Sequence, residues 1–201
     1  MRFDDLYLRR GDKLVHVRLY DVATPEAGVI FVGGVHGGFS SPAGGLYGQL
    51  AEALAARDVL CIHLRFRHST DLVESVRDVG VALGYLEDRK VPWIGLVGHA
   101  FGAAVMVRAA VGMERVRAVV ALAPQSHGSE AVGTLGPRAR LLVVHGLEDE
   151  VLPPRCATHL HERATPPKRL LLFPGAGHEL LEVTEQVRDA VLHWLEAAHE
   201  S

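Results

Sequence analysis

Short apolar runs alternate with helix-like segments along most of this chain, and that alternation restricts its possible folds more than any other feature of the sequence. The runs that predict strands cover residues 29–32, 59–66, 94–97, 116–123, 141–145 and 169–173. The segments that predict helices cover about 45–57, 71–88, 154–163 and 180–199, and another follows residues 98–102. Because short continuous apolar runs are typical of strands buried on both faces, the pattern predicts an α/β fold with a mostly parallel central sheet and helices on both faces.

The N-terminal segment has a different pattern. Residues 6–10 and 14–20 predict two strands joined at Gly11 and Asp12, a favoured two-residue turn, so we expect an antiparallel hairpin at the edge of the sheet. No linker interrupts the alternation, which predicts a single domain over residues 1–201. Residues 125–138 are too few for a lid, so we expect no cap domain.

Composition excludes several classes of function. The formal net charge is −3 and the sequence has no basic stripe, which argues against a nucleic-acid partner. No apolar stretch reaches the ~18 residues of a membrane span, and the first residues lack the apolar run of a signal peptide, so we expect no membrane partner and a cytoplasmic location. Cys61 and Cys156 show no metal-ligand spacing and no HExxH motif is present, so we expect neither a metal nor another cofactor.

Four predicted strand ends carry unusual residues. They are the glycine-rich stretch 33–38, the turn 98–102, Asp149 and His178. In open parallel sheets, ligands bind outside the carboxyl ends of the strands. We therefore expect these four segments to meet at one edge of the sheet and to form the functional site.

The turn 98–102 (Gly-His-Ala-Phe-Gly) joins a predicted strand directly to a predicted helix. A tight Gly-x-x-x-Gly turn of this kind is a nucleophile elbow, which raises its middle residue, here Ala100, above the sheet edge. The backbone N–H of Phe101 would then point at a substrate oxygen. We expect the second donor of such an oxyanion hole in the loop that contains Gly37 and Gly38.

An acid and then a histidine should follow such an elbow, and Asp149 and His178 come in that order. The histidine would take a proton from a nucleophile, and the acid would orient the histidine and stabilise its cation. Simpler interpretations exist for both residues, because Asp149 could cap the following helix and His178 could pair with Glu182.

These motifs resemble those of the α/β-hydrolase superfamily, and in particular of its small, lid-poor members related to dienelactone hydrolases and bacterial carboxylesterases. Residues 97–102 resemble the elbow, usually Gly-His-Ser-x-Gly, and 145–153 resemble the segment that presents the acid. Residues 174–178 resemble the loop of the triad histidine, and 36–38 resemble the His-Gly oxyanion loop. The resemblance implies serine-dependent hydrolysis of small esters or related acyl substrates by a catalytic triad at Ala100, Asp149 and His178. It leaves the acyl group and the oligomeric state open.

The sequence departs from the family pattern at the nucleophile. Ala100 has neither a hydroxyl nor a thiol, so it cannot attack a carbonyl carbon. Loss of a triad nucleophile costs about 10⁶ in turnover, or roughly 8 kcal/mol, so we expect the chain as written to be inactive. Ser40, Ser41 and Ser126 lie elsewhere in the pattern, and we expect the adjacent His99 to point away from the pocket.

Ala100 allows more than one explanation, so whether the chain is an enzyme stays open. It could be an engineered Ser-to-Ala variant of a working hydrolase, since the other site motifs are intact. It could instead be a natural non-catalytic protein that binds a small ligand or a protein partner. A purely structural role would leave four site motifs unused. In either of the first two cases we expect a shallow site for small acyl compounds, with Phe39, Phe101 and Leu152 as apolar walls.

Overall fold

The computed structural model describes residues 3–199, which fold around one eight-stranded sheet. The strand order is β1-β2-β4-β3-β5-β6-β7-β8. The strands are β1 (Asp4–Arg10), β2 (Lys13–Tyr20), β3 (Ala27–Val32), β4 (Val59–Leu64), β5 (Ile94–His99), β6 (Val116–Leu122), β7 (Arg140–Gly146) and β8 (Lys168–Phe173). β1 and β2 pair antiparallel, β2 also runs antiparallel to β4, and all other pairs are parallel. The predicted parallel sheet with an antiparallel N-terminal hairpin is confirmed.

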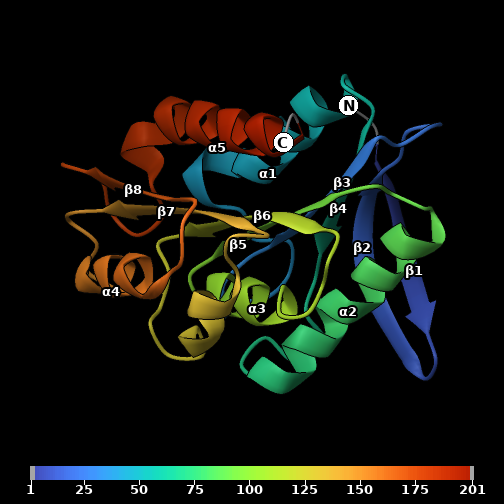
Figure 1. Ribbon diagram of the computed structural model, residues 1–201, viewed down its shortest axis with the longest axis horizontal. Helices are drawn as coiled ribbons and strands as arrows, with labels where there is room; N and C mark the ends of the chain where they lie inside the picture. The colour runs from blue at the N-terminus through green and yellow to red at the C-terminus, as the bar shows by residue number, and fades with distance from the viewer. Residues whose placement is uncertain (1–2, 200–201) are drawn as a thin grey trace.

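Helices cover both faces of this sheet. They are α1 (Pro42–Ala55), α2 (Leu72–Asp88), α3 (Phe101–Ala109), α4 (Arg155–Arg163) and α5 (Thr184–His199), with short 3₁₀ helices η1 (Glu130–Thr134) and η2 (Leu181–Val183). α1 and α5 lie on one face, while α2, α3 and α4 lie on the other (Figure 1). A separate cluster of buried apolar side chains fills each side. The central strands β3, β4 and β5 are buried along their whole length, as their continuous apolar runs predict.

A local sequence signal explains where α2 begins, whereas α1 and the C-terminal helix differ from the expected bounds. Asp71 caps α2, because its carboxylate accepts a hydrogen bond from the backbone N–H of Glu74. α1 begins at Pro42, earlier than expected, but residues 43–45 have positive φ and interrupt it, so regular helical geometry starts near the predicted residue 45. The predicted helix 180–199 is divided, because Leu180 adopts a left-handed conformation and η2 precedes α5.

The parallel strands deliver their carboxyl ends to one edge of the sheet. The loop after β3, the turn after β5 and the segments after β7 and β8 therefore approach one another there, as expected for an open parallel sheet. Within residues 3–199, none of the helices is both long enough and apolar enough to cross a membrane.

Candidate active site

Ala100 occupies a strained turn between β5 and α3. Its φ of 52° and ψ of −114° lie outside the regions that residues with a Cβ atom usually adopt. Its backbone N–H donates to the carbonyl oxygen of Leu122 on the neighbouring strand at 2.9 Å. The turn is thus tied to the sheet, and the residue after it, Phe101, begins α3.

Two glycines make this turn sterically feasible. A Cβ atom on Gly98 would lie 2.3 Å from the carbonyl oxygen of Gly102. A Cβ atom on Gly102 would lie 2.4 Å from the carbonyl oxygen of Gly33 at the end of β3. Real Cβ atoms do not approach so closely, so both positions require glycine. The Gly-x-x-x-Gly spacing therefore has the steric function that a nucleophile elbow needs.

Asp149 follows β7 and holds His178 in a defined orientation. One carboxylate oxygen, Oδ1, accepts from the backbone N–H groups of Val151 and Leu152 at 2.9 and 2.8 Å. The other, Oδ2, lies 2.8 Å from Nδ1 of His178 and 3.0 Å from Nε2 of His145. The Asp149 carboxylate is buried, and the His178 side chain is 15% exposed. The acid therefore has hydrogen-bond donors on both oxygens.

These contacts set the charge of Asp149 and the tautomer of His178. Burial alone would raise the pKa of the Asp149 carboxyl, but hydrogen bonds from Leu152, His178 and Val151 outweigh it and hold this pKa below its ordinary value. Asp149 is therefore ionised at neutral pH and accepts a hydrogen bond from Nδ1 of His178. With that proton on Nδ1, Nε2 of neutral His178 carries the lone pair and can act as a base.

A cavity of about 130 Å³ lies where these segments meet. It is bordered by Ala100, Phe101, Leu152 and His178, and also by Gly34 and Val35. The structure thus brings together the elbow, the histidine and two of the expected apolar walls, Phe101 and Leu152, with Asp149 behind the histidine. The N–H of Phe101 belongs to the first turn of α3, where backbone N–H groups have no partner within the helix.

Gly37 and Gly38, where we predict the second oxyanion donor, are not among the residues that border this cavity. Gly34, Val35 and His36 border the cavity, and a Cβ atom on Gly34 would lie 3.5 Å from the Cβ of Ala100. A Cβ atom on Gly37 would instead face Ser69. Because β3 already ends at Val32, the chain passes Ala100 two residues later and turns away before Gly37. Of the His-Gly pair at 36–37, His36 borders the cavity, whereas Gly37 does not.

Phe39, a predicted apolar wall, does not border this cavity either. Its ring lies outside the cavity lining and packs edge-on against His16 and His63, with centroid distances of 5.0 and 5.2 Å. The guanidinium carbon of Arg18 lies 4.3 Å from its centroid. These partners come from β2 and β4, so Phe39 anchors the loop to the hairpin side of the sheet. Val35 and Val151 supply apolar surface at the cavity instead.

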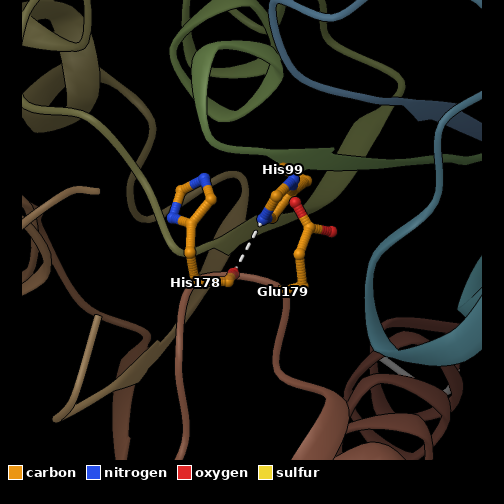
Figure 2. A group of neighbouring side chains, drawn as sticks. All are labelled: His99, His178 and Glu179. Carbon is orange, nitrogen blue, oxygen red and sulfur yellow. Dashed lines mark hydrogen bonds between the residues drawn. The ribbon is translucent and has the colours of Figure 1, made fainter. Parts of the chain in front are cut away.

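The expectation that His99 points away from the pocket is wrong. It is buried yet borders the cavity, and its ring centroid lies 4.7 Å from that of His178. Its Nε2 lies 3.0 Å from the carbonyl oxygen of His178, the contact drawn in Figure 2. Burial lowers the pKa of His99, so the ring is neutral at neutral pH. Glu179 also borders the cavity, and its position directly after His178 was the only sequence signal for it.

Comparison with known proteins agrees with this architecture. The dienelactone hydrolase family model matches residues 37–199. Est1E from Butyrivibrio proteoclasticus superposes with a TM-score of 0.84 at 15% identity, covering 98% of this chain and 99% of that one. A dienelactone hydrolase from Anabaena variabilis gives 0.82 at 18% identity, with coverages of 98% and 97%. An alpha-beta serine hydrolase homologue from Coxiella burnetii gives 0.79 at 19% identity, with coverages of 96% and 97%.

No curated protein matches the chain. At such low identities the solved structures show the fold alone, an α/β-hydrolase fold shared over nearly the whole length. The family model is more specific, because it matches most of the sequence, including the elbow and the segments that carry Asp149 and His178. The chain belongs to the dienelactone hydrolase family.

Proposed function

We propose that this protein is a scaffold for serine-dependent hydrolysis of small esters or related acyl compounds, and that it is inactive as written because Ala100 replaces the nucleophile. The observation that carries the proposal is the Asp149–His178 hydrogen bond of 2.8 Å at a cavity that Ala100 also borders. An oriented histidine beside a strained elbow is the arrangement that nucleophilic acyl transfer requires.

A serine at position 100 would complete the chemistry. Nε2 of His178 would take the hydroxyl proton as the oxygen attacks the acyl carbon, and Asp149 would stabilise the resulting imidazolium. The N–H of Phe101 is one donor for the oxyanion, and the loop at Gly34 and Val35 is the source we propose for the second. A water molecule would then attack the acyl-enzyme while His178 takes its proton, which releases the acid and regenerates the serine.

A second candidate function is ligand binding without turnover. It is favoured by Ala100 itself, because a methyl group leaves the cavity open and cannot form an acyl-enzyme. Ferulic acid is bound in a solved structure of Est1E from Butyrivibrio proteoclasticus. Small aromatic acids and their esters are therefore suitable probes for this cavity, alongside acetyl and lactone compounds.

The experiment that tests the hydrolase proposal is Ala100→Ser. We expect burst release of p-nitrophenol from p-nitrophenyl acetate and covalent labelling by a fluorophosphonate, with a rate roughly 10³-fold or more above the parent chain. The double variant Ala100→Ser with His178→Gln should lose both signals, because its serine has no base. A folded Ala100→Ser protein that is inert towards esters, thioesters, lactones and the fluorophosphonate would refute the proposal. Saturable binding of an ester by that inert variant would favour the second candidate.

A further inference from the structure

Two histidines and a glutamate gather at the cavity in an arrangement that the triad does not require. His99 ends β5, whereas His178 and Glu179 lie in the loop between β8 and η2. One ring nitrogen from each histidine and one carboxylate oxygen of Glu179 lie within 4.8 Å of one another. Figure 2 shows the Glu179 carboxylate beside the His99 ring, with the His178 ring on the other side. Imidazole nitrogens and a carboxylate are ligands that borderline divalent metals prefer.

Both imidazoles are oriented by oxygen acceptors. Nδ1 of His178 donates to Asp149, and Nε2 of His99 lies 3.0 Å from the carbonyl oxygen of His178. Each ring therefore keeps a lone pair on its other nitrogen. Histidines that bind metals almost always donate their second N–H to a carboxylate or a backbone carbonyl, which fixes the tautomer and raises the basicity of the ligand nitrogen. Asp149 and the His178 carbonyl are placed to do this.

The surrounding charges favour a cation. A second cavity of about 320 Å³ is bordered by His178 and Glu179, and also by Glu148, Glu150 and Glu182. Its described lining contains no lysine or arginine. The pKa of Glu182 is held below its ordinary value by backbone hydrogen bonds, including one from Gly177, so this carboxylate stays charged. Such a wall of carboxylates raises the local concentration of a divalent cation.

We propose that His99, His178 and Glu179 bind one divalent transition-metal ion such as Zn²⁺. Two imidazoles and a carboxylate, with a fourth position left for water, form a ligand set that zinc uses. Ligand atoms around a tetrahedral zinc lie about 3.3 Å apart, so the three groups must close by roughly 1.5 Å. The exposed side chain of Glu179 can supply that movement. Because the ion would take the lone pair of His178, metal binding would block this residue from acting as a base.

The test uses the tag-free chain as it stands, with Zn²⁺ followed by calorimetry and Co²⁺ followed by its visible absorption. We expect about one equivalent to bind, and the Glu179→Gln variant to raise Kd at least tenfold because it removes a ligand. Glu182→Gln is the matched control, since it removes one charge from the same acidic wall without removing a proposed ligand. We expect this control to raise Kd less than threefold. Circular dichroism checks that both variants are folded.

Three results would overturn the proposal. They are no saturable binding up to 1 mM metal, binding that Glu179→Gln leaves unchanged, and an equal loss in the two glutamate variants. The last result would assign the affinity to the acidic wall alone. In an active Ala100→Ser protein, Zn²⁺ should inhibit hydrolysis, and Glu179→Gln should weaken the inhibition by the same factor as the binding. Calorimetry on the parent chain does not depend on that activity, so failure of the hydrolase proposal and failure of the metal site are distinguishable.

Discussion

Asp149 is the residue whose replacement tests the site most directly, because its carboxylate has partners on both oxygens. In the Asp149→Asn variant, the amide oxygen can still accept from the backbone N–H groups of Val151 and Leu152. The amide NH₂ group, however, would face Nδ1 of His178, which donates in the parent chain. The substitution therefore removes the buried charge and the charge-assisted bond that His178 donates, because Nδ1 of His178 can then only accept from the amide in the other tautomer, while it preserves side-chain volume.

The size of the effect follows from these contacts. A hydrogen bond to a charged group contributes about 1.5–3 kcal/mol, and His178 loses one on replacement of Asp149. His145 loses less, because its Nε2 also lies 2.9 Å from the carbonyl oxygen of Leu152. We expect Asp149→Asn to lower the free energy of unfolding by about 2 kcal/mol at pH 7. Asp149→Ala should cost about 3–5 kcal/mol, because it also leaves two backbone N–H groups without their acceptor.

The pH dependence of the free energy of unfolding shows whether the buried Asp149 side chain is ionised or protonated in the folded state. The pKa of Asp149 is lower in the folded state, so its stabilisation is complete above the ordinary aspartate pKa of about 3.9 and is lost as pH falls through the lower folded value. The contribution of the Asp149 charge to the difference between parent and Asp149→Asn should therefore be fully present at pH 5 and shrink below pH 4. Urea unfolding measures it, with Glu150→Gln as an exposed neighbouring control that should change stability by less than about 0.5 kcal/mol. A difference below 0.5 kcal/mol for Asp149→Asn at pH 7 would refute the reasoning.

Two further predictions concern the scaffold. Gly102→Ala should destabilise the fold by at least about 1–3 kcal/mol in urea unfolding, because its Cβ would overlap the carbonyl oxygen of Gly33. Gly80→Ala in α2 should instead stabilise the fold by about 0.5–1 kcal/mol, because the added Cβ would meet nothing within 4 Å beyond its own helix backbone and chain neighbours. Equal effects of the two substitutions would contradict the steric argument. Burial, assisted by Arg18, lowers the pKa of His63 from 6.5 to about 4. Because His63 binds a proton more readily in the unfolded state, the free energy of unfolding should fall by up to about 3 kcal/mol as the pH drops from 6.5 to 4. If a His63→Gln variant shows the same fall, His63 is not its source.

The strand and helix pattern was predictable because burial imposes it on the sequence. Most of the continuous apolar runs form strands inside the sheet, although the run 169–173 forms the edge strand β8. The signals at Gly11–Asp12 and Asp71 are local turn and hydrogen-bond preferences. The order and strand-end positions of Asp149 and His178 were equally readable, because an open parallel sheet gathers its carboxyl ends at one edge. The structure places these two residues in direct hydrogen-bond contact.

The sequence could not predict which loop residues border the cavity, because that depends on where each loop turns. The His-Gly pair at 36–37 matched a motif, but only the end of β3 at Val32 decides that Gly34 passes the elbow. Phe39 is an apolar residue close in sequence to the predicted site, but its ring packs against the guanidinium of Arg18 on the hairpin side of the sheet. The same limit explains Glu179, which no periodicity or motif distinguishes. Its proximity to His99 arises from a contact between segments about eighty residues apart.

The conformation of Ala100 bears on the meaning of the missing hydroxyl. A left-handed φ costs an alanine roughly 1–2 kcal/mol, and the methyl group makes no hydrogen bond that could compensate for it. The strain is sustained by the surroundings, namely the bond from Ala100 N–H to Leu122 and the close contacts of Gly98 and Gly102. The elbow is therefore a property of the scaffold and does not depend on a nucleophile. A serine at this position would need no backbone rearrangement, so the Ala100→Ser experiment tests the chemistry of the site and not its folding.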